Sequence, residues 1–474
     1  RIFSMNIRDT KRILFIIRAA EHFHYNKSII TALGKRGFHV RLLLDGKWSK
    51  GGSLETINEF QHAHSWFEYG WARARQDWWR HILFYTRELL SYRRYLVVQE
   101  DRQSIYYSNR WRGYLPPKIQ QILALPLMEW LLQRFAVAWF LRCVERIAPP
   151  SRFIIKDIRS FAPVCVMASP VNMRFPRSDL EYLKAAVALK IPTVLPVISW
   201  DNLTTKGLIH VWPDMLLVWN DIQRKEAKIH QDFPMDRVRI VGAPFFDNWF
   251  EHLKPSLTRE EFCRMHGLRP EDLIVLYLGS STHMAEDETW LVEGLRHAFD
   301  ISPDMRLKRV QIIIRPHPTN FQIYQKLKGR GNILLLPEKG TLPDSSLSLQ
   351  LFYDTLYYSV AAIDGANTSA IIDSLIAGKP GIAIMTEKYK KTQSETKHFK
   401  QLVDEDALEL VHGVEEIPAV IATLADGKDT RKEKRNAFIM RYIRPMGIGR
   451  CVGEVAADAI EELLKKFNQR MYKK

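Results

Sequence analysis

The sequence predicts an α/β protein whose two domains are each built on a mainly parallel sheet. Short apolar runs, typical of strands that are buried on both faces, alternate with amphipathic helical patterns over most of the chain. Several of these runs end in loops rich in Gly, Ser, Thr or Asn, the position at which α/β sheets bind ligands. A length of 474 residues allows two or three domains.

The first domain is expected over residues 1–242. Strand 11–17, helix 27–34 and strand 40–44 give it a strand–helix–strand opening. The pattern continues with strands at 163–168, 192–198, 215–219 and 238–241, and with helices at 179–189 and 221–230. A linker over 243–271 follows; it contains two prolines and a short helical stretch, so we expect it to be ordered.

The second domain is expected over residues 272–452, where strands and helices alternate regularly. Its strands are predicted at 273–278, 310–314, 333–336, 360–363, 380–384 and 408–411, and its helices at 287–299, 320–328, 347–357 and 368–377. The last segment, 453–474, contains a helix with apolar residues at helical spacing.

Residues 45–150 break the alternation and are expected to form a helical insertion in the first domain. Between Trp71 and Lys118, ten Arg or Lys face four Asp or Glu, with eleven aromatics among them. One interpretation is an interfacial or acceptor-binding surface for anionic membrane. The other is an insertion with an aromatic core and solvated arginines. The surface cations of the first interpretation are Arg73, Arg75, Arg80 and Arg87.

Composition narrows the class of protein further. The net charge of +16 favours phosphate-bearing or other anionic partners. The four cysteines are scattered without a Cys-x-x-Cys pair, as expected for reduced thiols in the cytosol. The longest apolar stretch, 122–144, is interrupted by charges, which predicts a buried or amphipathic helix rather than a membrane span.

Residues suited to phosphate binding follow three strands of the predicted second domain. A small, hydroxyl-rich turn at 279–282 can let the backbone approach a phosphate, and Arg315 can donate two parallel hydrogen bonds. The third strand leads to Asn367-Thr368-Ser369, any of which can cap the next helix, whose N-terminus attracts anions.

The helix after Ser369 carries punctuation at both ends. Gly378 suits the C′ position and Pro380 prevents continuation. Asp373 lies about one turn inside the helix, where it can accept hydrogen bonds from ribose hydroxyls. An ordinary strand–helix unit with a capped helix would show the same residues, so the anion site and this plain structural role both remain open.

At these residues the chain resembles the C-terminal half of GT-B glycosyltransferases and their relatives. The resemblance rests on Gly-Ser-Ser at 279–281, Arg-Pro-His-Pro at 315–318, and Asn-Thr-Ser, Asp and Ala-Gly-Lys-Pro between 367 and 380. It covers roughly residues 150–470, and the relatives include sugar-nucleotide epimerases and polyol-phosphate transferases. It implies two Rossmann-like domains facing a cleft, with the terminal helix crossing back onto the first. The nucleotide-sugar-binding residues it implies are Gly279, Ser280, Ser281, Thr282, Arg315, His317, Asn367, Thr368, Ser369 and Asp373.

The acceptor side is expected on loops of the first domain, after its first strand and after strand 192–198. Candidate general bases are Asp201, His24 and Glu21, with His22 beside them. Asp201 can equally well cap a turn. His22 and His24 have no third metal ligand nearby in sequence, and the Asp-Glu-Asp run at 404–406 is interpreted as solvated surface, so no metal site is predicted.

These expectations combine into a metal-independent glycosyltransferase that needs no cofactor. It would move a sugar from a nucleotide-diphosphate donor, with a UDP-sugar favoured, to a glycan or lipid-linked acceptor of the bacterial surface. The expected place is the cytosol, peripherally on the inner face of the membrane, and no nucleic-acid partner is expected. The alternatives are a CDP-polyol phosphotransferase, a sugar-nucleotide epimerase, and a non-enzymatic RNA- or membrane-binding scaffold.

Overall fold

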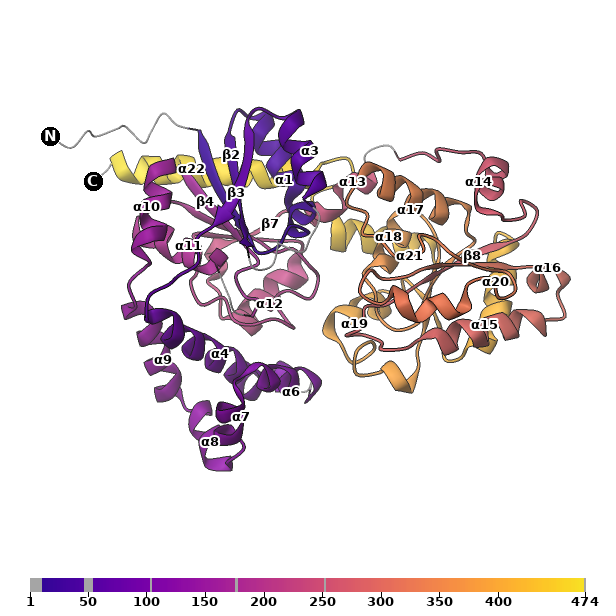
Figure 1. Cartoon of the computed structure of the whole chain (residues 1–474), viewed down its shortest axis with the longest axis horizontal. Coiled ribbons are helices and arrows are strands. Elements are labelled where there is room, and N and C mark those ends of the chain that lie inside the picture. Colours follow the sequence, from indigo (N-terminus) through magenta and orange to yellow (C-terminus); the bar gives the residue numbers. More distant parts are fainter. Residues whose placement is uncertain (1–10, 47–53, 103–104, 175–177, 251–252, 473–474) are drawn as a thin grey trace. The chain divides into compact units, whose positions relative to one another are not determined.

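The computed structural model describes residues 11–46, 54–102, 105–174, 178–250 and 253–472 (Figure 1). The chain forms two compact units. Unit 1 comprises Arg1–Asp247 and Tyr442–Lys474, and unit 2 comprises Asn248–Arg441. Each contains one parallel sheet, so the predicted fold class is confirmed.

The sheet of unit 1 has seven strands in the order β3-β2-β1-β4-β5-β6-β7, and every neighbouring pair is parallel. The chain winds outward from β1 in one direction and then from β4 in the other, so the strand order reverses between them. The strands are β1 (Arg12–Ile17), β2 (His39–Asp45), β3 (Phe67–Ala72), β4 (Cys165–Ser169), β5 (Thr193–Pro196), β6 (Met215–Val218) and β7 (Val238–Ile240).

Helices cover both faces of this sheet. They are α1 (His22–Lys35), α3 (Glu55–Ala63), α10 (Arg152–Phe161), α11 (Ser178–Ala188), α12 (Asp221–Gln231), η2 (Met235–Arg237), η3 (Pro244–Phe246) and α22 (Val452–Tyr472). The terminal helix α22 packs on α1, and Val452, Ala456 and Ile460 join the core on that face. The first helix begins at His22 rather than at residue 27, so both candidate histidines lie inside it.

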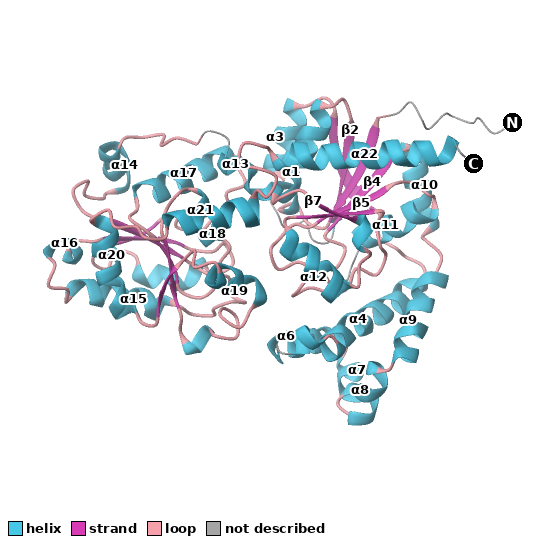
Figure 2. Ribbon diagram, turned by 180° about the vertical axis from the view of Figure 1, so that it is seen from behind, coloured by secondary structure: helices cyan, strands magenta, loops and turns pink. Residues whose placement is uncertain are grey.

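The described residues of the insertion, between β3 and α10, form helices (Figure 2). They are α4 (Trp79–Val97), α5 (Gln99–Arg102), α6 (Ile105–Tyr114), α7 (Pro117–Leu123), α8 (Pro126–Gln133) and α9 (Phe135–Ile147). The prediction that the insertion begins at residue 45 is wrong, because 67–72 form the edge strand β3. The single helix expected over 122–144 is also wrong: Pro126 begins a new helix, and extended Arg134 separates it from α9.

Most aromatics of this insertion form its own core. Tyr92, Tyr95, Tyr107 and Trp111 are buried together, as the structural interpretation of the aromatic stretch predicts.

Two of the four arginines expected on the surface are buried instead. Arg75 and Arg87 bind Glu181, and Arg87 also binds Glu145. Lys184 completes this buried network by pairing with Glu145 at 2.9 Å. Arg75 and Arg87 are therefore neither solvated nor available to a membrane. Their burial is tolerable because both are paired with carboxylates.

Unit 2 contains six parallel strands in the order β10-β9-β8-β11-β12-β13. The strands are β8 (Ile274–Leu278), β9 (Gln311–Arg315), β10 (Ile333–Leu335), β11 (Ala362–Asp364), β12 (Gly381–Ile384) and β13 (Glu409–Val411). This sheet repeats the doubly wound order of unit 1, with its reversal between β8 and β11.

The helices of unit 2 follow the predicted alternation with two differences. They are α14 (Arg259–His266), α15 (Thr289–Asp300), α16 (Met305–Lys308), η4 (Phe321–Leu327), α17 (Ser346–Tyr358), α18 (Ala370–Ile376), η5 (Glu387–Tyr389), α19 (Lys397–Asp404), η6 (Val414–Glu416), α20 (Ile417–Ala425), α21 (Lys432–Phe438) and η7 (Ile439–Ile443), with α13 (Asp247–Phe250) at the unit boundary. Segment 320–328 is a 3₁₀ helix rather than an α-helix. The chain returns to unit 1 at Tyr442 rather than at 453, because the Tyr442 carbonyl accepts a hydrogen bond from buried Asn220.

Candidate functional site

The reversal point of the unit 2 sheet gathers the three predicted phosphate loops at one edge. Strand β8 lies between β9 and β11, with Leu278 in register with both Arg315 and Asp364. The loops that follow these three residues therefore leave the carboxyl edge side by side, where open α/β sheets bind their ligands.

Hydrogen bonds join the three loops. The Asn367 N–H donates to the Ser280 hydroxyl at 3.3 Å, and the Gly279 N–H donates to the Arg315 carbonyl at 2.9 Å. A Cβ on Gly279 would lie 2.8 Å from the Tyr324 hydroxyl, so a larger residue there would have to displace this tyrosine. Thr282 donates to the carbonyl of Thr319, which ties the first loop to the second.

Arg315 is the cation at the centre of these loops. Its side chain is buried above the ring of Phe352, with 4.0 Å between the guanidinium carbon and the ring centroid. Nη2 donates to the Thr341 carbonyl at 2.7 Å, whereas Nε and Nη1 make no hydrogen bond within the described part of the chain. Burial lowers the Arg315 pKa to about 10, so the guanidinium stays charged at neutral pH.

His317 is held as a neutral imidazole with a defined tautomer. The Thr319 N–H donates to Nδ1 at 3.1 Å, so Nδ1 carries no proton and Nε2 must carry it. Burial, with a smaller contribution from His283, lowers the His317 pKa to about 4. His317 can therefore donate a hydrogen bond from Nε2 to a phosphate or sugar oxygen without carrying charge.

The third loop leads into α18, which differs in detail from the prediction. The helix has seven residues, and its N-cap Ser369 makes no capping hydrogen bond. Asn367 does not cap it; its amide donates to the Thr392 carbonyl and approaches His398 instead. Gly378 has a φ of 76°, as expected for the C′ position. A short helix adds little dipole, so the anion-binding capacity of this loop lies mainly in its own N–H and hydroxyl groups.

Several polar atoms around this edge are buried without a hydrogen-bond partner in the described part of the chain. They are Asp364 Oδ2, Asn367 Oδ1, Asp373 Oδ1, Thr386 Oγ1 and both amide atoms of Gln393. Buried polar atoms are normally paired, and unpaired ones cost about 1–3 kcal/mol each. Their concentration at one sheet edge is typical of a site that a polar ligand completes.

Two carboxyl groups at this edge are strongly perturbed by burial. Burial raises the Asp364 pKa to about 8, helped by the neighbouring Glu288 carboxylate. Burial also raises the pKa of Asp373 well above its usual range, opposed by the charge of Arg315. Asp373 is 3% exposed, so the carboxyl predicted to reach ribose lies beside Arg315 rather than at the surface.

Sequence reasoning missed three polar residues at this edge. Glu288 accepts from the Ser280 N–H and from the hydroxyls of Tyr324 and Tyr277, and so fixes the first loop from beneath. Gln393 and His398 lie in the segment beyond η5. No signal in the sequence identified them, because all three come from loops or helix ends without a recognisable pattern.

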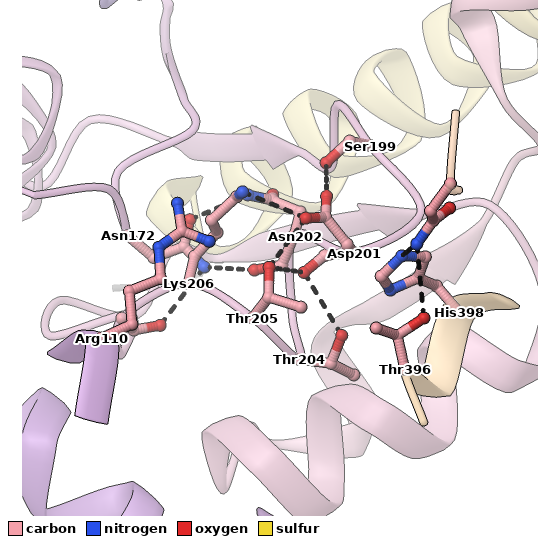
Figure 3. Close-up of polar contacts among 12 residues, drawn as sticks. Arg110, Asn172, Ser199, Asp201, Asn202, Thr204, Thr205, Lys206, Thr396 and His398 are labelled. Atoms are coloured by element: carbon pink, nitrogen blue, oxygen red, sulfur yellow. Dashed lines mark hydrogen bonds and ion pairs between the residues drawn. The ribbon is translucent and has the colours of Figure 1, made fainter. Parts of the chain in front are cut away.

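In unit 1, Asp201 lies in the loop after β5 with both carboxylate oxygens occupied (Figure 3). Oδ1 accepts from the Ser199 hydroxyl at 2.6 Å. Oδ2 accepts from the Thr205 hydroxyl at 2.7 Å and from the Lys206 ammonium at 3.0 Å. A carboxylate with three donors organises its loop, which favours the structural role considered for Asp201.

The insertion holds this loop from the other side. Arg94 donates to the carbonyls of Leu203 and Thr204, and the Tyr95 hydroxyl donates to that of Lys206. The Trp111 indole donates to the Thr205 carbonyl at 3.2 Å. Aromatic and basic residues that the sequence could assign only to a surface or a core therefore also position the loop that carries Asp201.

The two histidines of α1 are buried and neutral. Burial lowers the pKa of His22 to about 3, with further contributions from Arg18 and Lys206, and that of His24 to about 4. Their Nδ1 atoms make no hydrogen bond in the described part of the chain. The Lys206 effect puts His22 near the Asp201 loop, whereas Glu21 is exposed at the start of the helix.

No group of three or more His, Cys, Asp or Glu in the described residues is arranged to hold a metal ion. In the run 404–406, Asp406 pairs with Arg431 and Lys434, and Glu405 pairs with Arg441. No described helix is long and apolar enough to cross a membrane.

Comparison with known proteins supports this architecture. No family model matches the sequence, and no curated protein matches it. A UDP-GlcNAc 2-epimerase from Methanocaldococcus jannaschii is similar in structure, with a TM-score of 0.53 and 13% identity over 95% of this chain and 99% of the other. A glycosyltransferase from Rickettsia africae has a TM-score of 0.54 and 11% identity, over 96% of this chain and 99% of its own. The Neisseria meningitidis UDP-GlcNAc 2-epimerase bound to UDP-GlcNAc has a TM-score of 0.52 and 11% identity, over 96% of this chain and 100% of its own.

The chain therefore has the GT-B fold, with two doubly wound parallel sheets. At these identities the likeness defines the fold alone.

Proposed function

We propose that this chain is a glycosyltransferase that binds a nucleotide-sugar donor at the carboxyl edge of the unit 2 sheet. The observation that carries the proposal is the joining of loops 279–282, 315–319 and 364–369 around buried Arg315, with unpaired polar atoms beside them. Two neighbours of the same fold are described as bound to UDP-GlcNAc, which favours a UDP-sugar.

The donor reacts when the bond from its anomeric carbon to the diphosphate breaks and a bond to an acceptor oxygen forms. Negative charge then develops on the leaving diphosphate, and groups that meet it in fixed positions lower the barrier. Arg315 supplies N–H donors and a full charge, His317 supplies Nε2–H, and loops 279–282 and 364–369 supply N–H and hydroxyl groups. We propose that no metal ion takes part.

The acceptor hydroxyl must lose a proton to a base, which we place in unit 1. Asp201 already accepts three hydrogen bonds, whereas His22 and His24 keep Nδ1 atoms that the described residues leave unbonded. The low pKa values of His22 and His24 make them weak bases, so Asp201 and the exposed Glu21 stay among the proposed candidates. The proposed acceptor is a glycan or lipid-linked sugar in bacterial surface polysaccharide synthesis, reached from the cytosol, where four separate free cysteines are stable.

A nucleotide panel tests the donor site, and product analysis tests the reaction. Thermal stability is measured with UDP, GDP, CDP, CMP and ADP; a ligand at 100 times its Kd stabilises the native state by about 2.7 kcal/mol. Incubation with UDP-GlcNAc then separates the activities. Release of UDP that depends on an acceptor supports glycosyl transfer, and formation of a 2-epimer without acceptor assigns an epimerase. Release of CMP from a CDP-polyol assigns a phosphotransferase, and absence of binding to every nucleotide refutes the donor site.

A further inference from the structure

The far end of the insertion exposes a concentration of large apolar side chains. Nine of the 25 large hydrophobic residues that are exposed in the described part of the chain lie between Ile122 and Ile147. The most exposed are Phe135 (77%), Ile147 (73%), Phe140 (61%) and Leu127 (60%). Large apolar side chains that are exposed together in one segment indicate an interaction site in a folded protein.

These residues are not surplus members of the core of the insertion. That core is formed by other side chains, among them Tyr95, Trp111 and Leu132. On α9, Glu145 faces inward and binds Arg87 of α4, while Phe135 and Trp139 lie on the outer side. Helices α7 and α8 form the end of the insertion farthest from the unit 1 sheet (Figures 1 and 2). We name residues 117–147, which comprise α7, α8, α9 and the residues between them, the tip.

The exposed charges of the tip are all positive. Its exposed ionisable residues are Lys118, Arg134, Arg142 and Arg146. Of its two carboxylates, Glu129 is half-buried, and Glu145 is fully engaged by Arg87 and Lys184. A surface that combines exposed aromatics with uncompensated cations complements an anionic lipid bilayer.

The order of residues along α9 matches the depth profile of such a bilayer. Phe135, Trp139, Arg142 and Arg146 follow one another at spacings of four, three and four residues, which puts them on one side of the helix. Arg146 lies about 10 Å along the axis from Trp139, at ~1.5 Å per residue. When the apolar half enters the headgroup region by about 5–10 Å, the arginines therefore meet the lipid phosphates.

The two arginines also open onto a cavity. Arg142 and Arg146 line a pocket of about 450 Å³, together with Lys184, Arg237, Val187 and Trp212. Glu145 also lines this pocket and pairs with Lys184, so Arg142, Arg146 and Arg237 are the cations left to meet a phosphate-bearing headgroup there.

We infer that the tip is a membrane-docking surface that inserts its exposed aromatic and aliphatic side chains into a bilayer rich in anionic phospholipid. This inference deepens the acceptor side of the proposed function, because it names the surface on which a lipid-linked acceptor would be met. The apolar residues provide insertion and the four cations provide selectivity for anionic lipid. The exposed apolar surface lies outside the stretch 71–118 that the sequence singled out.

The test is co-sedimentation of the full chain with vesicles of equimolar phosphatidylglycerol and phosphatidylcholine, and with phosphatidylcholine alone. The apolar variant replaces Leu127, Phe135 and Phe140 with Gln. Its matched control replaces Ile301, Met305 and Leu347 of unit 2, whose exposures of 66%, 65% and 82% are similar. The charge variant changes Arg134, Arg142 and Arg146 to Gln, with Lys225, Lys432 and Lys465 to Gln as its control.

We expect wild type to bind the anionic vesicles and to be released as salt rises from 0.1 to 1 M. The apolar variant should lose more than about tenfold in its partitioning onto vesicles. The charge variant should lose about a hundredfold, because each of its three cations strengthens binding to anionic lipid roughly fivefold. Both controls should bind like wild type. Equal binding to both vesicles, or tip variants that bind like wild type, would overturn the inference.

Sedimentation equilibrium without lipid separates the competing occupant. Self-association that the apolar variant abolishes, with no vesicle binding, would assign this face to a second copy of the chain and overturn the inference. UDP binding of every variant is measured by calorimetry in parallel. A chain that docks on vesicles but binds no nucleotide refutes the proposed function alone, and one that binds UDP but no vesicle refutes the docking surface alone.

Discussion

Replacing Arg315 tests the donor site most directly. Nη2 is committed to the Thr341 carbonyl, and Nε and Nη1 remain available for two hydrogen bonds to a diphosphate. A hydrogen bond to a charged group contributes about 1.5–3 kcal/mol. Losing two of them in Arg315→Gln should cost about 3 kcal/mol of binding free energy, a weakening of roughly a hundredfold. Arg315→Lys keeps the positive charge but loses the paired N–H donors of the planar guanidinium, so it should weaken binding by only about tenfold.

The assay is isothermal titration calorimetry with UDP, and Arg296→Gln is the matched control. Arg296 is also a buried arginine of unit 2 that donates to backbone carbonyls, those of Val310 and Lys308, and lies over Phe299. Both Gln variants should lose thermal stability to a similar degree, but only the variant at 315 should lose affinity. An Arg315→Gln protein that is folded and binds UDP within threefold of wild type would refute the placement of the phosphates.

Three further predictions concern titration, metal and the loop that carries Asp201. Because burial raises the Asp364 pKa to about 8, the native state binds more protons than the unfolded state between about pH 4 and 8. Unit 2 should therefore lose stability as pH rises through that window, by up to about 1.4 kcal/mol per pH unit. Asp364→Asn should flatten this dependence of the melting temperature on pH. A dependence that Asp364→Asn leaves unchanged contradicts the pKa assigned to Asp364. Sugar transfer should survive EDTA, and loss of activity that Mn²⁺ restores would contradict the metal-independent mechanism. Trp111→Phe removes one hydrogen bond to the Thr205 carbonyl and should raise the KM for acceptor severalfold with unchanged UDP affinity in calorimetry; the reverse pattern would detach this loop from acceptor binding.

The sequence predicts most of the two sheets because parallel strands buried on both faces are continuous apolar runs. Residues 312–314 are three isoleucines in the middle of β9, and the polar residues that follow must then lie at the carboxyl edge. The phosphate loops could be located in this way without knowledge of contacts. The contacts that shape the site, such as Glu288 with Ser280, depend on chain turns for which the sequence has no local pattern.

The insertion was harder to predict because its long-range contacts decide which residues are exposed. Arg87 is buried because Glu145, 58 residues away, and Glu181, 94 residues away, meet it. Local composition cannot distinguish such an arginine from the exposed Arg142. The exposed apolar residues of α8 and α9 were equally hidden, because a stretch of Leu, Trp and Phe predicts burial unless its partners are known to be elsewhere.

Helix α4 sets the distance between the tip and the loop that carries Asp201 within unit 1. Two consecutive residues of this helix hold different parts: Arg93 donates to the carbonyls of Leu132 and Gln133 at the end of α8, and Arg94 donates to the loop that carries Asp201. Consecutive residues of one helix make these two attachments, so α4 ties the tip directly to the loop that carries Asp201. On a bilayer, α4 would then act as a spacer of constant length between the lipid phosphates and the loop that carries Asp201.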